Sequence, residues 1–253
     1  NTSGASNTAV GYNALDANTT AQRNTGVGYD AMTANTTGDY NTAVGAYALD
    51  ANTTGDNNTA VGDASLSSTT TGAENTAVGR YALFANTTAD NNTSLGFRAG
   101  EAITTGIDNT LVGSNSGQSE TTGSGLTGVG KAALQNSTGS YNTAVGVSAL
   151  GAVTGNHNVA IGRNTGNNNT SISYCTAIGD YALDAAGTGN SNVAIGYQAM
   201  TANTTGNVNT AVGVNALAAN TTGEQNIAIG ENAAQSNTTG NFNTAVGRSA
   251  LQA

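Results

Sequence analysis

Aliphatic and small polar residues alternate in a pattern that returns at every seventeenth position along nearly the whole chain. Each repeat reads approximately N-T-A-V-G, then a small residue followed by Leu, then N-T-T-G. Fifteen copies can be aligned, two of them shorter than the rest by a single position. A repeat this short and strict indicates a solenoid in which each copy forms one coil. The copies begin at Asn7, Asn24, Asn41, Asn58, Asn75, Asn92, Asn109, Leu126, Asn142, Asn158, Cys175, Asn192, Asn209, Asn226 and Asn243.

The residues of one repeat, numbered here as positions 1 to 17 from its Asn, predict a short strand followed by a corner. Position 5 is Gly and position 4 is Val, Ile or Leu in all fifteen copies, and position 2 is always β-branched. A strand over positions 2 to 4 would place 2 and 4 on one face, with position 3, mostly Ala, facing the other way. The Gly predicts positive φ or a close approach between backbones. We expect the aliphatic residue at position 4 and the Leu or Met at position 9 to form the core.

These elements favour an all-β fold, a parallel β-solenoid (β-roll) of about fifteen coils of 16–17 residues. Helical repeats need a longer unit than this one, and N-T-T-G is rich in turn-forming types. We predict one continuous repeat domain over residues 1–253, in which the Asn side chains of position 1 stack and bond amide to amide. The region around 99–174 is less regular, because Gly100, Gly117 and Gly166 replace the position-9 Leu. Thinner packing or a bend is expected there.

The composition excludes several classes of protein. Charged residues make up 8% of the chain, which has no Pro and a net charge of −9. Disorder is rejected because an aliphatic residue returns in every repeat. The negative charge argues against a nucleic-acid partner, and no apolar run is long enough for membrane insertion. The absence of Pro fits a fold in which most backbone N–H groups are hydrogen-bonded.

The sequence contains no evident catalytic set, so we expect neither an enzyme nor a cofactor. A general base needs a partner and a pocket, and the single His, His157, is better interpreted as an exposed corner residue. Cys175, the single Cys, replaces an Asn of the ladder and is expected to be a buried thiol. Asp39 and Asp56 occupy the same position in consecutive coils and should stack about 5 Å apart. This pair is a candidate cation site, with a solvated corner as the alternative.

Aromatic residues gather at the corners of the predicted coil, directly after the invariant Gly. Exposed Tyr can stack on sugar rings or anchor a protein interface. The alternative is that these residues cover a corner or pack between chains. The candidate surface-recognition residues are Tyr12, Tyr29, Tyr47, Tyr81, Tyr181 and Tyr197.

Three copies resemble a known family most closely: NVAIG at residues 158–162 and 192–196, and NIAIG at 226–230. They resemble the N-x-V-A-I-G repeat of YadA-like trimeric autotransporter heads, and similar repeats occur in phage tail fibres. The resemblance implies a left-handed parallel β-roll, three chains side by side, that binds host matrix or other surfaces. This chain departs from the family in its longer coil and in the Thr that usually replaces the first aliphatic residue.

We therefore expect a structural fibre or adhesin segment, outside the cell on a cell or virion surface, that mediates attachment or display. The expected partner is the chain itself, as a homotrimer whose Ala-rich faces allow close approach, with a host-surface glycan or matrix protein as a further partner. One alternative is a filament subunit that stacks end to end through open solenoid ends. A second is an ice-binding solenoid that uses ladders of Thr and Asn.

Overall fold

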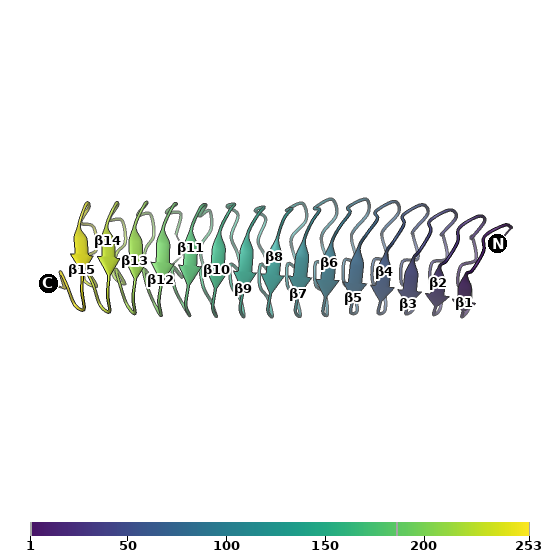
Figure 1. Ribbon diagram of the computed structural model, residues 1–253, viewed down its shortest axis with the longest axis horizontal. Helices are drawn as coiled ribbons and strands as arrows, with labels where there is room; N and C mark the ends of the chain where they lie inside the picture. The colour runs from purple at the N-terminus through teal and green to yellow at the C-terminus, as the bar shows by residue number, and fades with distance from the viewer. Residues whose placement is uncertain (1, 186, 253) are drawn as a thin grey trace. The chain divides into compact units, whose positions relative to one another are not determined.

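The computed structural model describes residues 2–185 and 187–252. The chain forms two compact units, Asn1–Leu126 and Thr127–Ala253. The described residues contain fifteen short strands, one in each repeat, and no helix (Figure 1). Every strand occupies positions 2 to 4 of its repeat, as the sequence predicted.

In the N-terminal unit the strands are β1 (Thr8–Val10), β2 (Thr25–Val27), β3 (Thr42–Val44), β4 (Thr59–Val61), β5 (Thr76–Val78), β6 (Thr93–Leu95) and β7 (Thr110–Val112). In the C-terminal unit they are β8 (Thr127–Val129), β9 (Thr143–Val145), β10 (Val159–Ile161), β11 (Thr176–Ile178), β12 (Val193–Ile195), β13 (Thr210–Val212), β14 (Ile227–Ile229) and β15 (Thr244–Val246).

Within each unit, consecutive strands pair in parallel and in register, so each residue lies beside its counterpart one repeat away. Val44 of β3, for example, pairs with Val61 of β4 in the N-terminal unit. In the C-terminal unit Ile178 of β11 pairs with Ile195 of β12. Backbone hydrogen bonds between coils continue around the turn, as from the N–H of Leu49 to the carbonyl of Ser65 (3.0 Å). Each unit is therefore an all-β parallel solenoid, which confirms that part of the predicted fold.

Each strand turns toward the core the face opposite to the one expected. The position-3 Ala points inward, as shown by Ala43 and Ala60, which are fully buried. The position-4 aliphatic residue points outward, and Val44 and Ile161 are 37% and 40% exposed. The prediction that position 4 forms the core was wrong, and so was the idea that Ala-rich faces are free to meet another subunit. The coil is narrow, so its interior accepts the smaller residue and leaves the larger one outside.

Position 9 supplies the large core side chains, as predicted. Leu49, Leu66 and Leu83 are fully buried in the N-terminal unit, as are Met200 and Leu217 in the C-terminal unit. The backbone is left-handed at all of them, with φ between 50° and 52°. L-amino acids other than Gly rarely adopt this conformation. It persists here because it directs the side chain into the core, where burial offsets the backbone cost.

Two columns of buried Asn complete the interior, at positions 1 and 12. Asn41 Nδ2 donates to the Gly55 carbonyl of its own coil (2.8 Å), and Asn41 Oδ1 accepts the N–H of Asn58 in the next coil (2.8 Å). At position 12, Asn52 Nδ2 donates to Asn35 Oδ1 (2.8 Å). The stacked Asn ladder is confirmed, but its principal partners at position 1 are backbone groups. These amides satisfy buried backbone groups that a short strand leaves unpaired.

The invariant Gly of position 5 meets both conditions that the sequence suggested. Gly45 has φ of 141°, a region open only to Gly. A Cβ atom on it would lie 2.5 Å from the carbonyl oxygen of Gly62 in the next coil. Any other residue would meet both the unfavourable φ and this clash, which explains why only Gly occurs at this position.

In the two coils with Gly100 and Gly117 at position 9, a Leu from position 3 lies beside both glycines. Leu111 occupies position 3, where most repeats have Ala, and it is fully buried. A Cβ on Gly117 would lie 2.7 Å from Leu111 Cδ1, and one on Gly100 would lie 3.1 Å from the same atom. One Leu side chain therefore occupies part of the space beside both glycines. Thinner packing or a bend in this region stays a prediction.

Candidate functional site

The residues at positions 6 and 7, directly after the corner Gly, form what we call the corner edge. Position 7 has a left-handed backbone, as at Tyr47 (φ 55°) and Tyr81 (φ 58°), so the chain turns sharply here. Five of the six Lys and Arg residues lie on this edge, and so do all six candidate Tyr residues. The five cations are Arg80, Arg98, Lys131, Arg163 and Arg248.

Three of the candidate Tyr residues are brought together on the corner edge of the N-terminal unit. The rings of Tyr12 and Tyr29 stack with centroids 5.3 Å apart, and Tyr47 meets Tyr29 edge to face at 5.4 Å. All three are exposed. The neighbouring carboxylate of Asp30 is the main cause that raises the pKa of the Tyr29 phenol, which therefore stays protonated at neutral pH. The group presents a neutral aromatic surface.

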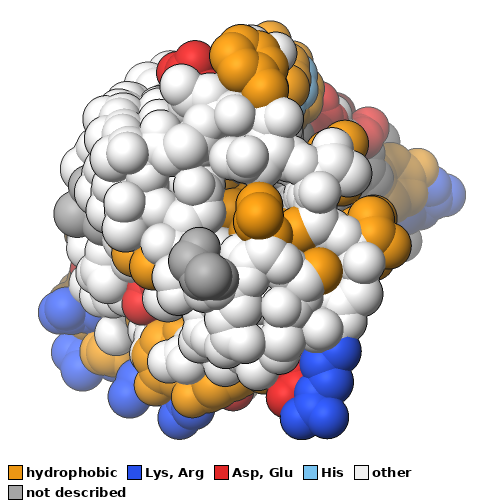
Figure 2. Space-filling view, turned by 90° about the vertical axis from the view of Figure 1, so that its left-hand side faces the viewer, with side chains coloured by type: hydrophobic (Ala, Val, Ile, Leu, Met, Phe, Trp, Pro, Cys, Tyr) orange, Lys and Arg blue, Asp and Glu red, His pale blue; other side chains and the backbone are white. Residues whose placement is uncertain are grey.

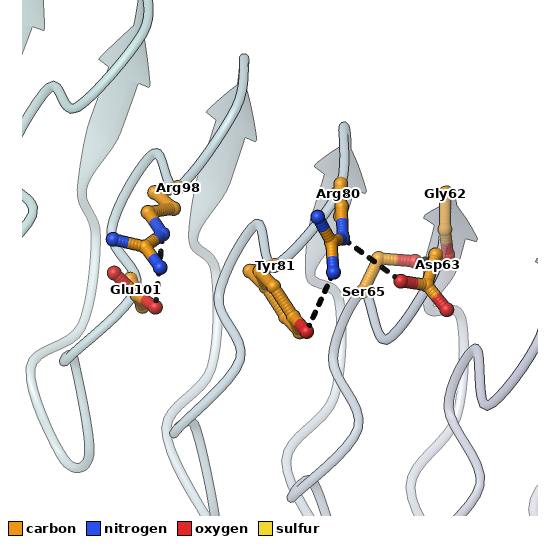
Figure 3. Close-up of polar contacts among 7 residues, drawn as sticks. All are labelled: Gly62, Asp63, Ser65, Arg80, Tyr81, Arg98 and Glu101. Carbon is orange, nitrogen blue, oxygen red and sulfur yellow. Dashed lines mark hydrogen bonds and ion pairs between the residues drawn. The ribbon is translucent and has the colours of Figure 1, made fainter.

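Tyr81 lies in a second group on the same edge, together with two Arg residues (Figure 3). The Arg80 guanidinium lies 4.5 Å from the centroid of the Tyr81 ring, and that of Arg98 lies 6.0 Å from it. Arg80 Nε pairs with Asp63 Oδ2 at 3.0 Å, and Arg98 Nε lies 3.5 Å from Glu101 Oε1. Hydrogen bonds to Asp63 and Tyr81 raise the pKa of Arg80, so its charge is permanent. This group combines both signs of charge with an aromatic ring.

The C-terminal unit repeats part of this arrangement around Tyr181. The Arg163 guanidinium lies 5.0 Å from the centroid of the Tyr181 ring, and Arg163 Nε lies 3.5 Å from Asp180 Oδ2. Tyr197 of the next coil meets Tyr181 edge to face at 6.4 Å. Tyr81 and Tyr181 are both half-buried because an Arg side chain covers one face of each ring.

Much of the remaining surface is neither charged nor hydrophobic. In the view of Figure 2, basic side chains lie beside hydrophobic or acidic ones in a few places, with broad areas of other polar side chains and backbone around them. No pocket is found in the part of the chain that the structure describes. The candidate site is therefore an exposed edge, and recognition there would rely on side chains presented in rows.

Asp39 and Asp56, the candidate cation pair, are engaged by backbone amides. The N–H of Asp39 donates to Asp56 Oδ1 (2.6 Å), and the N–H of Gln22 donates to Asp39 Oδ1 (2.7 Å). Side chains at this position make the same bond elsewhere, as from the N–H of Asn190 to Asn207 Oδ1 (2.8 Å). Residues 2–185 and 187–252 contain no group of three or more His, Cys, Asp or Glu placed to hold a metal ion. Binding of a cation by this pair stays a prediction. The hydrogen bonds to backbone N–H groups give each carboxylate a structural role, which could not be read from the sequence because position 16 is variable.

His157 is exposed, as expected, but it is not isolated. Its ring stacks between those of Tyr141 and Tyr174, with centroids 5.0 Å and 5.2 Å away and interplanar angles of 8°. The three residues close consecutive coils, and that shared position was the signal available in the sequence. Cys175 is buried, and burial raises the pKa of its thiol. The thiol is therefore protonated at neutral pH, which fits the predicted structural role.

No protein-family model matches the chain, and no curated protein matches it either. None of the described residues belongs to a helix that is long and apolar enough to cross a membrane.

Proposed function

We propose that this chain is a segment of a stiff fibre on a cell or virion surface, where it mediates attachment or display without catalysing a reaction. The observation that carries the proposal is the separation of structural and exposed variable positions within each coil. Positions 1, 3, 5, 9 and 12 are used for contacts inside and between coils, whereas positions 6 and 7 present variable side chains outward. A scaffold with a variable exposed edge is suited to spacing and presenting contacts along a surface.

We further propose that the fibre is a homotrimer of left-handed coils. The support for association is the outward face of the strands, where β-branched and aliphatic residues of positions 2 and 4 line up in register. Val44, Leu95, Ile161 and Ile229 are each 37–42% exposed on such faces. Rows of exposed aliphatic side chains mark interaction surfaces, and burying this face between chains would supply the apolar area that a narrow coil lacks.

The mass of the purified protein in solution tests the trimer. We expect light scattering to give three times the chain mass of 24.8 kDa. A Val44→Glu, Val61→Glu double variant should dissociate the trimer, because it places charges on the outward face of β3 and β4. Thr54→Glu, on an exposed turn of the same unit, is the matched control and should leave the mass unchanged. A monomeric wild-type protein would contradict the trimer.

The two alternatives give different outcomes in simple measurements. In a filament, particle length in electron micrographs would rise with protein concentration, whereas a discrete fibre segment keeps one length. In an ice-binding solenoid, the protein would produce thermal hysteresis. The Asn ladders cannot serve that second role, because both Asn columns are buried. Only exposed Thr, such as Thr54, remains available for it.

Attachment itself is tested with cells or surfaces. The fluorescently labelled protein should bind to a surface that carries its partner. Substitution of the exposed Tyr12 and Tyr29 by Ser should reduce that binding and leave the solution mass unchanged. Binding that is insensitive to every substitution on the corner edge would contradict a recognition role for this edge.

A further inference from the structure

In the group around Tyr81, two guanidinium groups meet at one aromatic ring. The chain carries six Lys and Arg residues against fifteen Asp and Glu. Even so, the guanidinium groups of Arg80 and Arg98, from adjacent coils, both lie within 6.0 Å of the centroid of one aromatic ring. The scaffold does not require them, because the corresponding positions in other coils carry residues as different as Tyr, Ala, Asp and Val.

Arg80 is held in a fixed orientation. Its Nε donates to Asp63 Oδ2 (3.0 Å), and its Nη2 donates to the Tyr81 hydroxyl (3.0 Å). The Tyr81 ring is itself braced by Phe84, which meets it edge to face with centroids 5.5 Å apart. Figure 3 shows the chain of contacts from Asp63 through Arg80 to Tyr81 across neighbouring coils. A guanidinium held in this way loses little entropy when it binds a further group.

The Arg98 guanidinium lies beside two aromatic rings, and one of its nitrogens has no hydrogen-bond partner among the described residues. Its guanidinium lies 5.2 Å from the centroid of Phe97 and 6.0 Å from that of Tyr81. Arg98 Nε is buried and has no hydrogen-bond partner among the described residues. Glu101 Oε1 is 3.5 Å away, too far for a good hydrogen bond, and Glu101 Oε2 already accepts from Gln118 Nε2 (3.0 Å). The buried Nε is out of reach of a ligand, but the Arg98 side chain as a whole is 41% exposed, so a ligand would meet its terminal nitrogens.

We propose that Arg80, Tyr81 and Arg98 form a binding site for the carboxylated sugar units of an acidic polysaccharide. Planar guanidinium groups bind carboxylates through two parallel hydrogen bonds. The exposed ring of Phe97 beside Arg98 offers an apolar surface on which a sugar ring can rest. The site deepens the attachment role proposed above and depends on that role for its biological meaning.

The charge balance favours a carboxylated sugar over a denser polyanion. The carboxylates of Asp63 and Glu101 balance the formal charges of Arg80 and Arg98, and the net charge of the chain is −9. Nucleic acid and heavily sulfated chains bind through long-range attraction to broad basic surfaces. A chain with one carboxylate per sugar can engage two guanidinium groups at short range, and it meets less repulsion from the rest of the protein than a heavily sulfated chain does.

The test measures binding of polygalacturonate oligosaccharides by calorimetry, with the fully methyl-esterified oligosaccharide as the uncharged match. We expect the wild-type protein to bind the free acid and not the ester. Arg80→Gln with Arg98→Gln should weaken binding at least about tenfold. Arg248→Gln is the matched control, because Arg248 forms an ion pair with Glu231 on the same edge (3.3 Å) and stacks on no ring among residues 2–185 and 187–252. Melting curves of each variant show whether it is folded.

Several outcomes would overturn the proposal. Equal binding of acid and ester, no binding of either, or an unchanged affinity in the folded double variant would each do so. Tighter binding of dextran sulfate than of polygalacturonate would replace carboxylate recognition by general anion attraction. The proposed function fails separately: a protein that binds the oligosaccharide yet remains monomeric and does not attach to surfaces contradicts the fibre and not the site. A trimeric, adherent protein that ignores the oligosaccharide contradicts only the site.

Discussion

Two stretches of the N-terminal unit fill the same interior with different residues. In the coils that begin at Asn41, Asn58 and Asn75, Ala occupies position 3 and Leu occupies position 9. In the coils that begin at Asn92 and Asn109, Gly occupies position 9 and Leu111 fills the space from position 3. Strand pairing is parallel and in register in both stretches. Over two coils, one Ser and one Leu at position 3 and two Gly at position 9 thus replace two Ala and two Leu, while the strand pairing stays the same.

The largest effect should come from a backbone position that both stretches share. Gly45→Ala forces a side chain into a conformation open only to Gly and against the carbonyl of Gly62. We expect a loss of about 4 kcal/mol or more in the free energy of unfolding, or failure to fold. Chemical denaturation measures it. The matched control is Gly26→Ala at position 3, where most coils already carry Ala; a change there beyond about 1 kcal/mol would contradict this account.

Leu111→Ala should empty the interior of the irregular stretch. Removing a fully buried Leu costs about 2–5 kcal/mol, depending on how far the site collapses. Adding Gly117→Leu should recover much of that loss, because the pair Ala and Leu then matches the regular coils. On its own, Gly117→Leu should destabilise the protein, since its Cβ would meet Leu111 Cδ1 at 2.7 Å. If a double-mutant cycle shows no coupling between positions 111 and 117, the side chains at these positions do not compete for the same space.

Asn52→Ala should break the polar column of the regular stretch. Asn52 Nδ2 donates to Asn35 Oδ1 and to the Gly55 carbonyl, and its Oδ1 accepts the Gly55 N–H. Leaving these buried groups unpaired should cost about 1–3 kcal/mol in thermal or chemical unfolding. Thr54→Ala, on the exposed turn that follows, is the control. Equal losses in the two variants would show that the column adds nothing specific.

Glu120 takes the position of the Asn column in the irregular stretch and should make its stability depend on pH. Its Oε1 accepts three backbone N–H groups, from Thr121, Thr122 and Gly123 (2.7–3.0 Å), while Oε2 is buried without a hydrogen-bond partner among the described residues. Burial raises the pKa of Glu120 above its ordinary value of 4.5. The folded state then binds more protons than the unfolded state, so stability falls as pH rises from 4.5 through the raised pKa.

Glu120→Gln keeps the Oε1 acceptor and removes the charge. We expect the variant to be more stable than the wild type at neutral pH and to lose part of the pH dependence, as followed by melting temperature from acid to neutral pH. Glu74→Gln, at an exposed position of the same unit, serves as the control for the removal of one charge. Parallel pH profiles for wild type and Glu120→Gln would contradict the effect.

The smallest effect should come from the corner edge. Arg80→Gln removes an ion pair whose side chains are 56% and 45% exposed, and exposed pairs contribute little to stability. We expect no measurable change in melting temperature. A clear loss would mean that the edge is part of the scaffold that both stretches share, and the separation of scaffold from recognition edge would fail.

Much of the fold could be predicted from particular residues. The position-5 Gly and the alternation before it placed each strand, because the pattern leaves room for only a short strand before the corner. The Asn at position 1 predicted a stacked ladder. The corner Tyr residues were named as surface candidates, but their partners were not. Tyr81 and Arg98 belong to consecutive repeats and are adjacent in space, and only their positions within the repeat connect them.

The sequence alone determined the coil, its length and the parallel stacking, because identical residues recur at a period that leaves one coil per repeat. It did not determine which strand face is inside, since Ala43 and Val44 are both apolar and alternate in either case. The tertiary structure decided that question through volume: the narrow interior holds the Leu of position 9 and the Asn columns, and only a small residue, most often Ala, fits opposite that Leu. The same packing turned the aliphatic row outward and set the rows of the corner edge side by side.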